Sequence, residues 1–132
     1  MTAASSAINA TGRRKTATAT AWLTPGKGQV TVNDRPFEEY FTTEAMRTAA
    51  MLPLQIAESA KKFDVVVRTR GGGLNGQAGA MKLAVARALT QINSELRPAL
   101  KKAKTLIRDP RKRERKKSGQ PGARARFQFS KR

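Results

Sequence analysis

The chain is 132 residues long, about the size of one domain, and its 27 Lys and Arg against nine Asp and Glu leave a formal charge of +18. It contains no His and no Cys, which excludes disulfides, thiolate zinc sites and catalysis that depends on an imidazole or a thiol. It has no run of about 18 uncharged apolar residues, so we predict no membrane-spanning helix. The first twelve residues lack the long apolar core of a secretory signal.

Charge and apolar residues are distributed unevenly along the chain. Residues 1–96 carry a net charge of +5, and residues 97–132 carry +13. From residue 108 onward, the large apolar residues are only Phe127 and Phe129. Such a composition does not support a core of its own. We therefore predict three parts: a disordered lead over residues 1–11, a globular body over residues 12–107 and an extended basic tail over residues 108–132.

The basic tail is predicted to contact a polyanion, because so many like charges in one segment repel each other. Residues 112–117 lack the apolar stripe that a helix lying on a membrane needs. Gly119, Pro121 and Gly122 would also interrupt such a helix. The predicted partner is therefore nucleic acid and not a membrane.

The body begins with a predicted strand that residues 12–15 open and in which small apolar and polar residues alternate over residues 16–23. Its inner face would carry Ala17, Ala19, Ala21 and Leu23, and its outer face would carry Trp22 with the threonines. Residues 24–28 predict a turn and residues 29–32 a second strand, so that the two strands would form a hairpin. Residues 35–37 would add a short third strand.

Two helical pieces are predicted next, after a brief helix at residues 38–41. Thr42 or Thr43 can cap a helix that runs to the residue before Pro53. Because proline disrupts a helix interior and is tolerated in a first turn, Pro53 is predicted to begin a second piece over residues 53–61.

Residues 63–70 predict the clearest strand of the chain. Its three consecutive valines indicate a central strand that is covered on both faces. A glycine-rich turn follows, then an amphipathic helix that ends near Asn93 and a last helix that begins at Ser94. We predict an α+β body of core order β-β-β-α-β-α, with one sheet and helices on one of its faces.

The glycine-rich turn has the spacing G-x-G-x-x-G at Gly71, Gly73 and Gly76. A dinucleotide site would need an acidic residue at a strand end about 20 positions later, but Glu95 precedes a predicted helix start. A phosphate-binding loop would need a lysine after the last glycine. Two compatible interpretations remain: the glycines allow close helix packing, or backbone N–H groups hold an RNA phosphate beside the cations Arg68, Arg70 and Lys82.

Four segments together resemble a known family. They are Gly-Arg-Arg-Lys at residues 12–15, Phe-Glu-Glu-Tyr-Phe at residues 37–41, the glycine-rich segment at residues 71–89, and the basic segment from Arg-Asp at residues 108–109 to the end. Their order and spacing are similar to those of the ninth universal protein of the small ribosomal subunit (ribosomal protein S nine), in its bacterial or organellar form. The resemblance covers residues 12–132, although residues 16–22 lack a basic residue that relatives often have there.

The resemblance implies a two-layer α/β sandwich with a left-handed crossover and an extended C-terminal tail. It further implies a non-enzymatic structural constituent that binds rRNA in the head of the small subunit, beside other head proteins. The tail would reach the peptidyl site and touch the anticodon stem-loop of the tRNA. The implied protein has no cofactor, metal or small-molecule substrate, and it works in ribosomes of a cytoplasm or an organelle.

The expected site residues follow from the resemblance and from the charge pattern. On the body, the expected rRNA-binding residues are Arg13, Arg14, Lys15, Arg68, Arg70, Gly71, Gly72, Gly73, Gln77 and Lys82. On the tail, they are Arg108, Arg111, Lys112, Arg113, Arg115, Lys116, Lys117, Arg124 and Arg126. The expected tRNA-contacting residues are Ser130, Lys131 and Arg132. Trp22 and Tyr40 are expected to serve packing.

Two other functions fit parts of the sequence. A free nucleic-acid binder would use the same charges without a fixed place in a particle. A nucleotide-dependent enzyme could be built on the glycine-rich turn, but the nine carboxylates are scattered, and the adjacent pair Glu38 and Glu39 would point to opposite sides.

Overall fold

The computed structural model describes residues 8–58, 62–112 and 115–124. The elements in chain order are β1 (Ile8–Arg14), β2 (Ala17–Pro25), β3 (Val30–Val32), β4 (Arg35–Pro36), α1 (Phe37–Tyr40), α2 (Glu44–Ile56), β5 (Phe63–Arg70), α3 (Leu74–Ile92), a 3-10 turn (Ser94–Leu96) and α4 (Arg97–Lys102). None of the helices in these ranges is long and apolar enough to cross a membrane.

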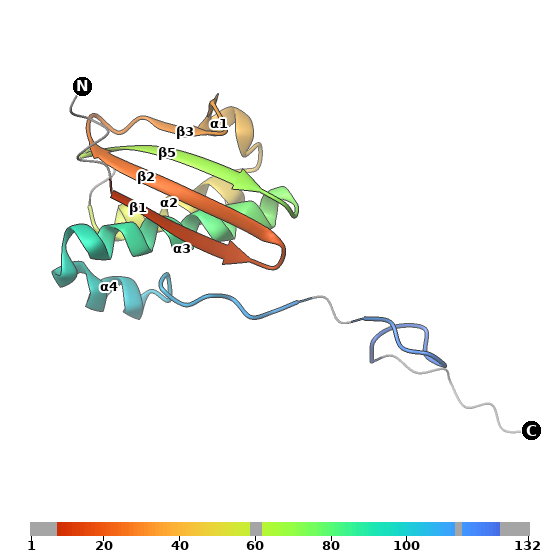
Figure 1. Ribbon diagram of the computed structural model, residues 1–132. Coiled ribbons are helices and arrows are strands. Elements are labelled where there is room, and N and C mark those ends of the chain that lie inside the picture. The colour runs from red at the N-terminus through yellow and green to blue at the C-terminus, as the bar shows by residue number, and fades with distance from the viewer. Residues whose placement is uncertain (1–7, 59–61, 113–114, 125–132) are drawn as a thin grey trace, which may run out of the picture.

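The five strands form one sheet in the order β1-β2-β5-β3-β4. Strand β2 runs antiparallel to β1 and to β5, whereas β3 runs parallel to β5 and antiparallel to β4. The helices lie together on one face of the sheet, with α3 against β1 and β2 and with α2 beside α3 (Figure 1). This arrangement confirms the predicted α+β class with helices on one face.

Strand β1 corrects two predictions. Residues 8–11, expected in the disordered lead, form its beginning, and residues 12–14, expected to open the next strand, form its end; residues 1–7 of the lead lie outside the described residues. It pairs with β2 through a turn in which Lys15 has a φ of 53°. Ala10 and Gly12 face α3. The turn was not predicted because Lys15 is not one of the residue types that mark turns.

The predicted hairpin between residues 16–23 and 29–32 is wrong, because β5 lies between β2 and β3. The chain crosses the beginning of β5 at residues 26–29. There the Asp64 carboxylate accepts hydrogen bonds from the backbone N–H groups of Lys27, Gly28 and Gln29 at 3.0–3.1 Å. These bonds, that from Gln29 first, lower the pKa of Asp64. The Asp64 carboxylate therefore holds the β2–β3 connection against the beginning of β5, the strand that lies between β2 and β3.

Helix α2 is continuous, which corrects the predicted break at Pro53. A proline inside a helix removes one backbone hydrogen bond, at a cost of about 3 kcal/mol. Pro53 and Leu54 are buried in the core, and the Pro53 carbonyl still accepts from the Ala57 N–H at 3.0 Å. Burial of this face offsets the lost bond. Thr43 precedes the helix but makes no side-chain capping bond, and the end of the predicted second piece, residues 59–61, lies outside the described residues.

Strand β5 is central, as predicted, but it is covered on one face only. Val65 and Val67 are fully buried against the helices, whereas Val66 is 44% exposed. Since the described helices lie on one side of the sheet (Figure 1), the middle valine faces the open side. The prediction of burial on both faces is therefore wrong.

The alanine face of β2 is confirmed as the inner face, because Ala17, Ala19, Ala21 and Leu23 are buried. Small side chains there allow α3 to lie close to the sheet, and the closest approach is at Gly12. A Cβ at Gly12 would be 2.5 Å from the Ala84 amide nitrogen of α3. Close packing is thus required in β1 as well as at the glycine-rich turn, where it was expected and where a Cβ on Gly72 would be 3.1 Å from the Ala17 Cβ.

After α4, residues 103–112 and 115–124 contain no helix or strand. Residues 103–112 stay beside the body, and residues 115–124 lie beyond it in Figure 1. The buried Thr105 ends the body, and its hydroxyl donates to the Leu100 carbonyl at 2.9 Å. The extended form of the whole tail stays a prediction, since residues 113–114 and 125–132 lie outside the described ranges.

The contact at Gly12 generates a prediction about stability. Gly12→Ala should lower the free energy of unfolding by about 1–3 kcal/mol, because the new methyl group must displace the backbone of α3. Gly76→Ala is the matched control: its Cβ would lie 3.5 Å from the nearest atom, and alanine favours the helix by up to about 1 kcal/mol. Urea unfolding of both variants measures the difference. Equal stabilities would contradict the packing of α3 on β1.

Candidate nucleic-acid interface

Two loops meet at one end of the body. The glycine-rich turn joins β5 to α3, and Gly71 and Gly72 adopt φ values of 76° and 62°, which favour glycine. A Cβ on Gly71 would be 2.5 Å from the Thr16 carbonyl oxygen, so the β1–β2 turn lies directly against it. Gly73 differs: a Cβ there would meet no atom within 4 Å. Residues 71–73 are exposed.

Three predicted cations line a hollow beside this junction. Arg14 and Lys15 come from the end of β1 and the β1–β2 turn, and Lys82 comes from the third turn of α3; the hollow has a volume of about 310 Å³ and is also lined by Asn75. The Arg14 side chain crosses Gly79, where a Cβ would be 2.5 Å from its Cδ. We name the surface formed by Arg14, Lys15, Lys82 and residues 71–73 the end surface.

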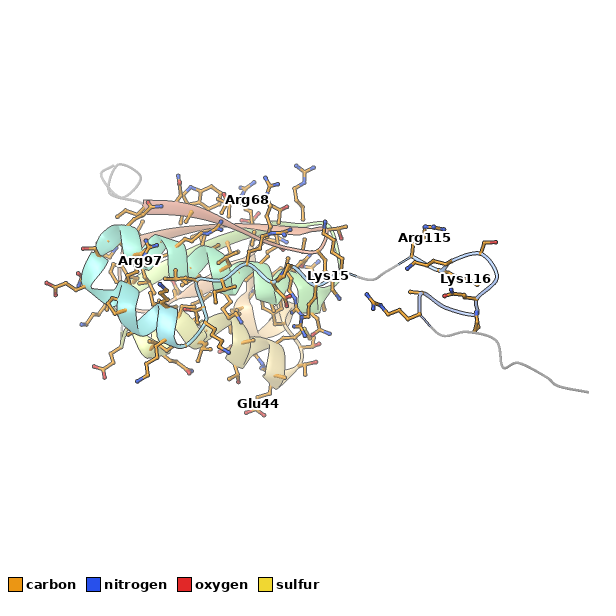
Figure 2. The ribbon with its side chains drawn as sticks, turned by 90° about the horizontal axis from the view of Figure 1, so that it is seen from below. Lys15, Glu44, Arg68, Arg97, Arg115 and Lys116 are labelled. Atoms are coloured by element: carbon orange, nitrogen blue, oxygen red, sulfur yellow. The ribbon has the colours of Figure 1, made fainter. Side chains whose placement is uncertain are left out.

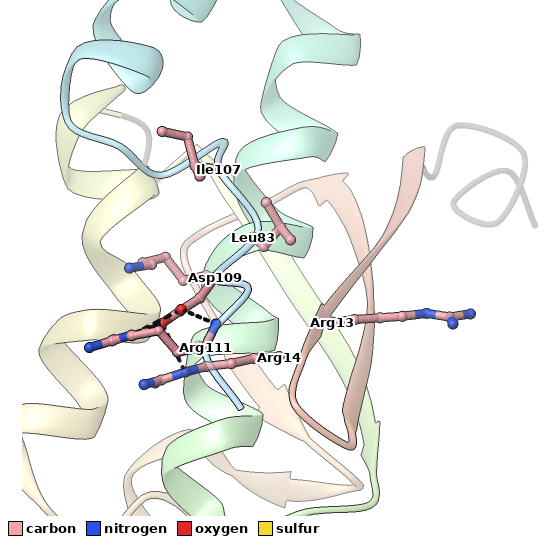
Figure 3. Close-up of a pocket in the computed structure, with 8 residues that line it drawn as sticks. Arg13, Arg14, Leu83, Ile107, Asp109 and Arg111 are labelled. Atoms are coloured by element: carbon pink, nitrogen blue, oxygen red, sulfur yellow. Dashed lines mark hydrogen bonds and ion pairs between the residues drawn. The ribbon is translucent and has the colours of Figure 1, made fainter. Parts of the chain in front are cut away.

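The beginning of the tail is bound to the end surface through Asp109. Its carboxylate accepts two hydrogen bonds from the Arg111 Nε at 3.0 Å and one from the Arg111 Nη2 at 2.7 Å, and its Oδ2 lies 3.5 Å from the Arg14 Nε (Figure 3). The Arg111 guanidinium, and secondarily its backbone N–H, holds the pKa of Asp109 well below its usual range. The first tail cations are thereby placed beside those of the body.

Asp109 was not among the expected site residues, because carboxylates do not bind phosphates. The sequence signal that could have found it is a lone acidic residue between Arg108 and Arg111. Next to it, Leu83 and Ile107 line a small hollow of about 90 Å³. Arg13 borders the same hollow, but its side chain points away from it (Figure 3).

Gln77 was expected to bind rRNA, and this prediction is wrong. Its side chain is buried: the Nε2 donates to the Gly71 carbonyl at 3.1 Å, and the Oε1 accepts from the hydroxyls of Tyr40 and Thr69. Asn33 completes the network by donating to the Tyr40 and Thr69 hydroxyl oxygens at 3.2 and 2.9 Å. Gln77 therefore fixes the glycine-rich turn from the inside. Tyr40 serves packing, as expected.

The other predicted cations of the body lie on the open face of the sheet. Arg13 is exposed on β1, and Arg68 and Arg70 are exposed on β5. Figure 2 shows Arg68 on the side of the sheet opposite to the helices. The expected residues thus divide into two groups, one at the end surface and one on the open face.

The tail cations fall into described and undescribed groups. Arg108, Arg111, Lys112, Arg115, Lys116, Lys117 and Arg124 are exposed. The expected Arg113, Arg126, Ser130, Lys131 and Arg132 lie outside the described residues. In the part of the chain that the structure describes, no three acidic side chains gather where they could hold a metal ion.

The chain is similar to known proteins over nearly its whole length. The family model "Ribosomal protein S9/S16" matches residues 12–132. The small ribosomal subunit protein uS9 of Methylacidiphilum infernorum (isolate V4) is 58% identical over 127 residues, which cover 96% of this chain and 93% of the relative. That of Chlorobium chlorochromatii (strain CaD3) is 57% identical over 125 residues, covering 95% and 97%.

The Asp109 contacts generate a prediction about the tail. Asp109→Asn should speed tryptic cleavage after Arg111 several-fold at pH 7, because the amide loses the charge that holds the two arginines. Since the folded pKa of Asp109 is lowered, the wild-type attachment is present above the ordinary value of 3.8 and is lost only as the pH falls below it. The control is Asp34→Asn, which changes an exposed carboxylate far from the tail in sequence. Identical cleavage rates for both variants and the wild type would contradict the attachment.

Proposed function

The chain belongs to the ribosomal protein S9/S16 family, a family of structural, non-enzymatic proteins of the small ribosomal subunit, and from this premise we propose that it binds rRNA in the head of that subunit through its end surface and its tail. It is a ribosomal protein that acts in translation. The nucleotide-dependent enzyme considered on the glycine motif has no support in such a family.

The observation that carries the proposal is the group of cations in the hollow next to the start of α3. No side chain caps α3, so its first backbone N–H groups remain available to an anion. Arg14, Lys15 and Lys82 line the hollow together with Asn75 of the first turn, and they supply countercharges for phosphates along this side of the helix. An RNA backbone offers such anions in series, so the end surface and the adjoining tail cations can follow one strand.

We propose that the tail continues along rRNA to the peptidyl site and that Ser130, Lys131 and Arg132 contact the tRNA bound there. Support comes from the high exposure of its described cations and from the lack of helix and strand in residues 103–112 and 115–124. A single extended strand can enter gaps in packed RNA that a folded domain cannot, and it orders as it binds. We also propose that neighbouring head proteins of the subunit are partners of the chain. The connection between β3 and β5 is proposed to be a left-handed crossover.

A free nucleic-acid binder with the same charges is the second candidate. It would leave the subunit when counterions compete for the phosphates. A ribosomal constituent should stay with the small subunit through sucrose gradients in high salt, because protein and rRNA contacts are made together. Sedimentation therefore separates the two.

The charge of the tail generates a prediction about salt. If about eight tail cations contact phosphates, the slope of log K against log salt should be about −6 for the purified protein on rRNA of the subunit head. Replacing Lys112, Arg115, Lys116 and Lys117 by Gln should make the slope less steep by about 3. A filter-binding series between low and moderate salt measures both. A slope near −1 for the wild type would refute this use of the tail.

Deletion of residues 128–132 generates a prediction about the tip. The shortened protein should bind rRNA nearly as well as the full chain, since most tail cations remain, but subunits that contain it should release peptidyl-site tRNA faster. The measurement is tRNA retention on subunits reconstituted with either protein. Replacing Lys101 and Lys102 by Gln is the control for lost charge. Equal retention by full-length and shortened protein would remove the assignment of the tip.

A further inference from the structure

The open face of the sheet carries three of the expected rRNA-binding residues, Arg13, Arg68 and Arg70, but the end surface and the tail do not include it. The described helices pack on the opposite face, and side chains stand free above the strands in Figure 2. The strand register arranges these side chains in three rows across the sheet. The rows are Arg13–Thr18–Arg70, Thr11–Thr20–Arg68 and Asn9–Trp22–Val66–Thr31.

Two of the rows are strongly basic. Arg13, Arg68 and Arg70 make no ion pair and no side-chain hydrogen bond with any residue that the structure describes. The acidic residue on this side is Asp64, at the far end of β5, and its Oδ1 already accepts from three backbone N–H groups. Three unpaired guanidinium groups within a few residues of one another favour an anionic partner.

The third row presents an aromatic ring and an apolar side chain to the same side. Trp22 was expected to serve packing, but it lies on the outer face of β2 and is half-buried, next to Val66, which is 44% exposed. Within the described ranges, the indole N–H of Trp22 has no hydrogen-bond partner. An aromatic and a large apolar residue adjoining on an open sheet indicate a contact surface.

The spacing of the rows allows one ligand to reach all of them. Residues two apart on a strand are about 7 Å apart, so Arg68 stands diagonally beside Trp22, and Arg70 stands one row further. The residues between them, Thr18 and Thr20, are small and carry hydroxyl groups. They leave room for a flat group above the sheet and can hydrogen-bond to sugar hydroxyls or phosphates.

We propose that this open face binds an unpaired segment of small-subunit rRNA, with a nucleobase stacked on Trp22 and neighbouring phosphates paired with Arg13, Arg68 and Arg70. The inference rests on the proposed function, since it names a second rRNA site on the same protein. Unpaired RNA is the occupant because the face combines cations with an accessible ring, and only an unstacked base can lie on that ring. A protein partner would need an acidic surface to match the arginines.

The experiment uses Trp22 itself, because it is the only tryptophan in the chain. The full-length protein is titrated with a transcript of the rRNA domain that forms the subunit head, and the tryptophan emission and the affinity are recorded. We expect the emission to be quenched on binding. Trp22→Ala should weaken binding by about 5- to 150-fold, the range for loss of one base stack, and Trp22→Phe should restore most of it.

Matched variants control for fold and charge. Arg68→Gln should weaken binding several-fold more than Lys101→Gln, which removes an exposed cation from α4. Circular dichroism of each variant confirms that the body remains folded.

Three outcomes would overturn the inference in distinguishable ways. In the first outcome, RNA leaves the emission of the wild-type protein unchanged, and Trp22→Ala and Arg68→Gln bind as tightly as the wild type while the tail variants bind weakly. This result removes the open-face site and leaves the proposed function intact. Emission that stays constant with RNA but changes on incorporation into whole subunits assigns the face to a neighbouring protein instead. No binding of the wild-type protein to the transcript or to subunits refutes the proposed function, and this inference with it.

Discussion

Helix α3 lies against β1 and β2 across a face of alanine and glycine, and this close packing determines what the body presents to its surroundings. Because Gly12 and the inner alanines of β2 have almost no side chain, the helix axis can approach the strands closely. The β1–β2 turn then lies against the glycine-rich turn, with the Thr16 carbonyl next to Gly71, and Arg14 and Lys15 line a hollow with Asn75 of the first turn of α3. The same packing places the described helices on one face and leaves the other face of the sheet open.

The body brings like charges together instead of separating them. Arg14 and Arg111 approach one carboxylate, that of Asp109, while three arginines share the open face without a partner among the described residues. Dispersing such charges over the surface would reduce their mutual repulsion and so stabilise the folded state of a protein that has no anionic partner. In the proposed function, phosphates of a bound RNA would supply the missing countercharge. This would explain why a chain of +18 can keep so few acidic residues.

The segments that resemble the family divide into supporting and binding parts. Tyr40, in the segment at residues 37–41, and Gln77, in the glycine-rich segment, meet in one buried hydrogen-bond network with Thr69 and Asn33. Fully satisfied networks of this kind fix a single arrangement, since any unpaired member would be costly. Their role is to hold the glycine-rich turn in place, and the cations around that turn are available for binding.

The sequence by itself determined the concentration of positive charge in the tail, the two faces of β2 and the central position of β5. It also determined the length of α3 and the glycine-rich turn between β5 and α3. Each of these features depends on the periodicity or composition of neighbouring residues. Tertiary structure alone decided that β5 separates β2 from β3, that α2 continues through Pro53, that Gln77 is buried and that Val66 faces the open side. These features depend on which distant segments pair and on which face the helices cover. A local pattern predicts that the two faces of a strand or helix differ. Only packing between segments far apart in the chain determines which of the two faces is exposed to water or RNA.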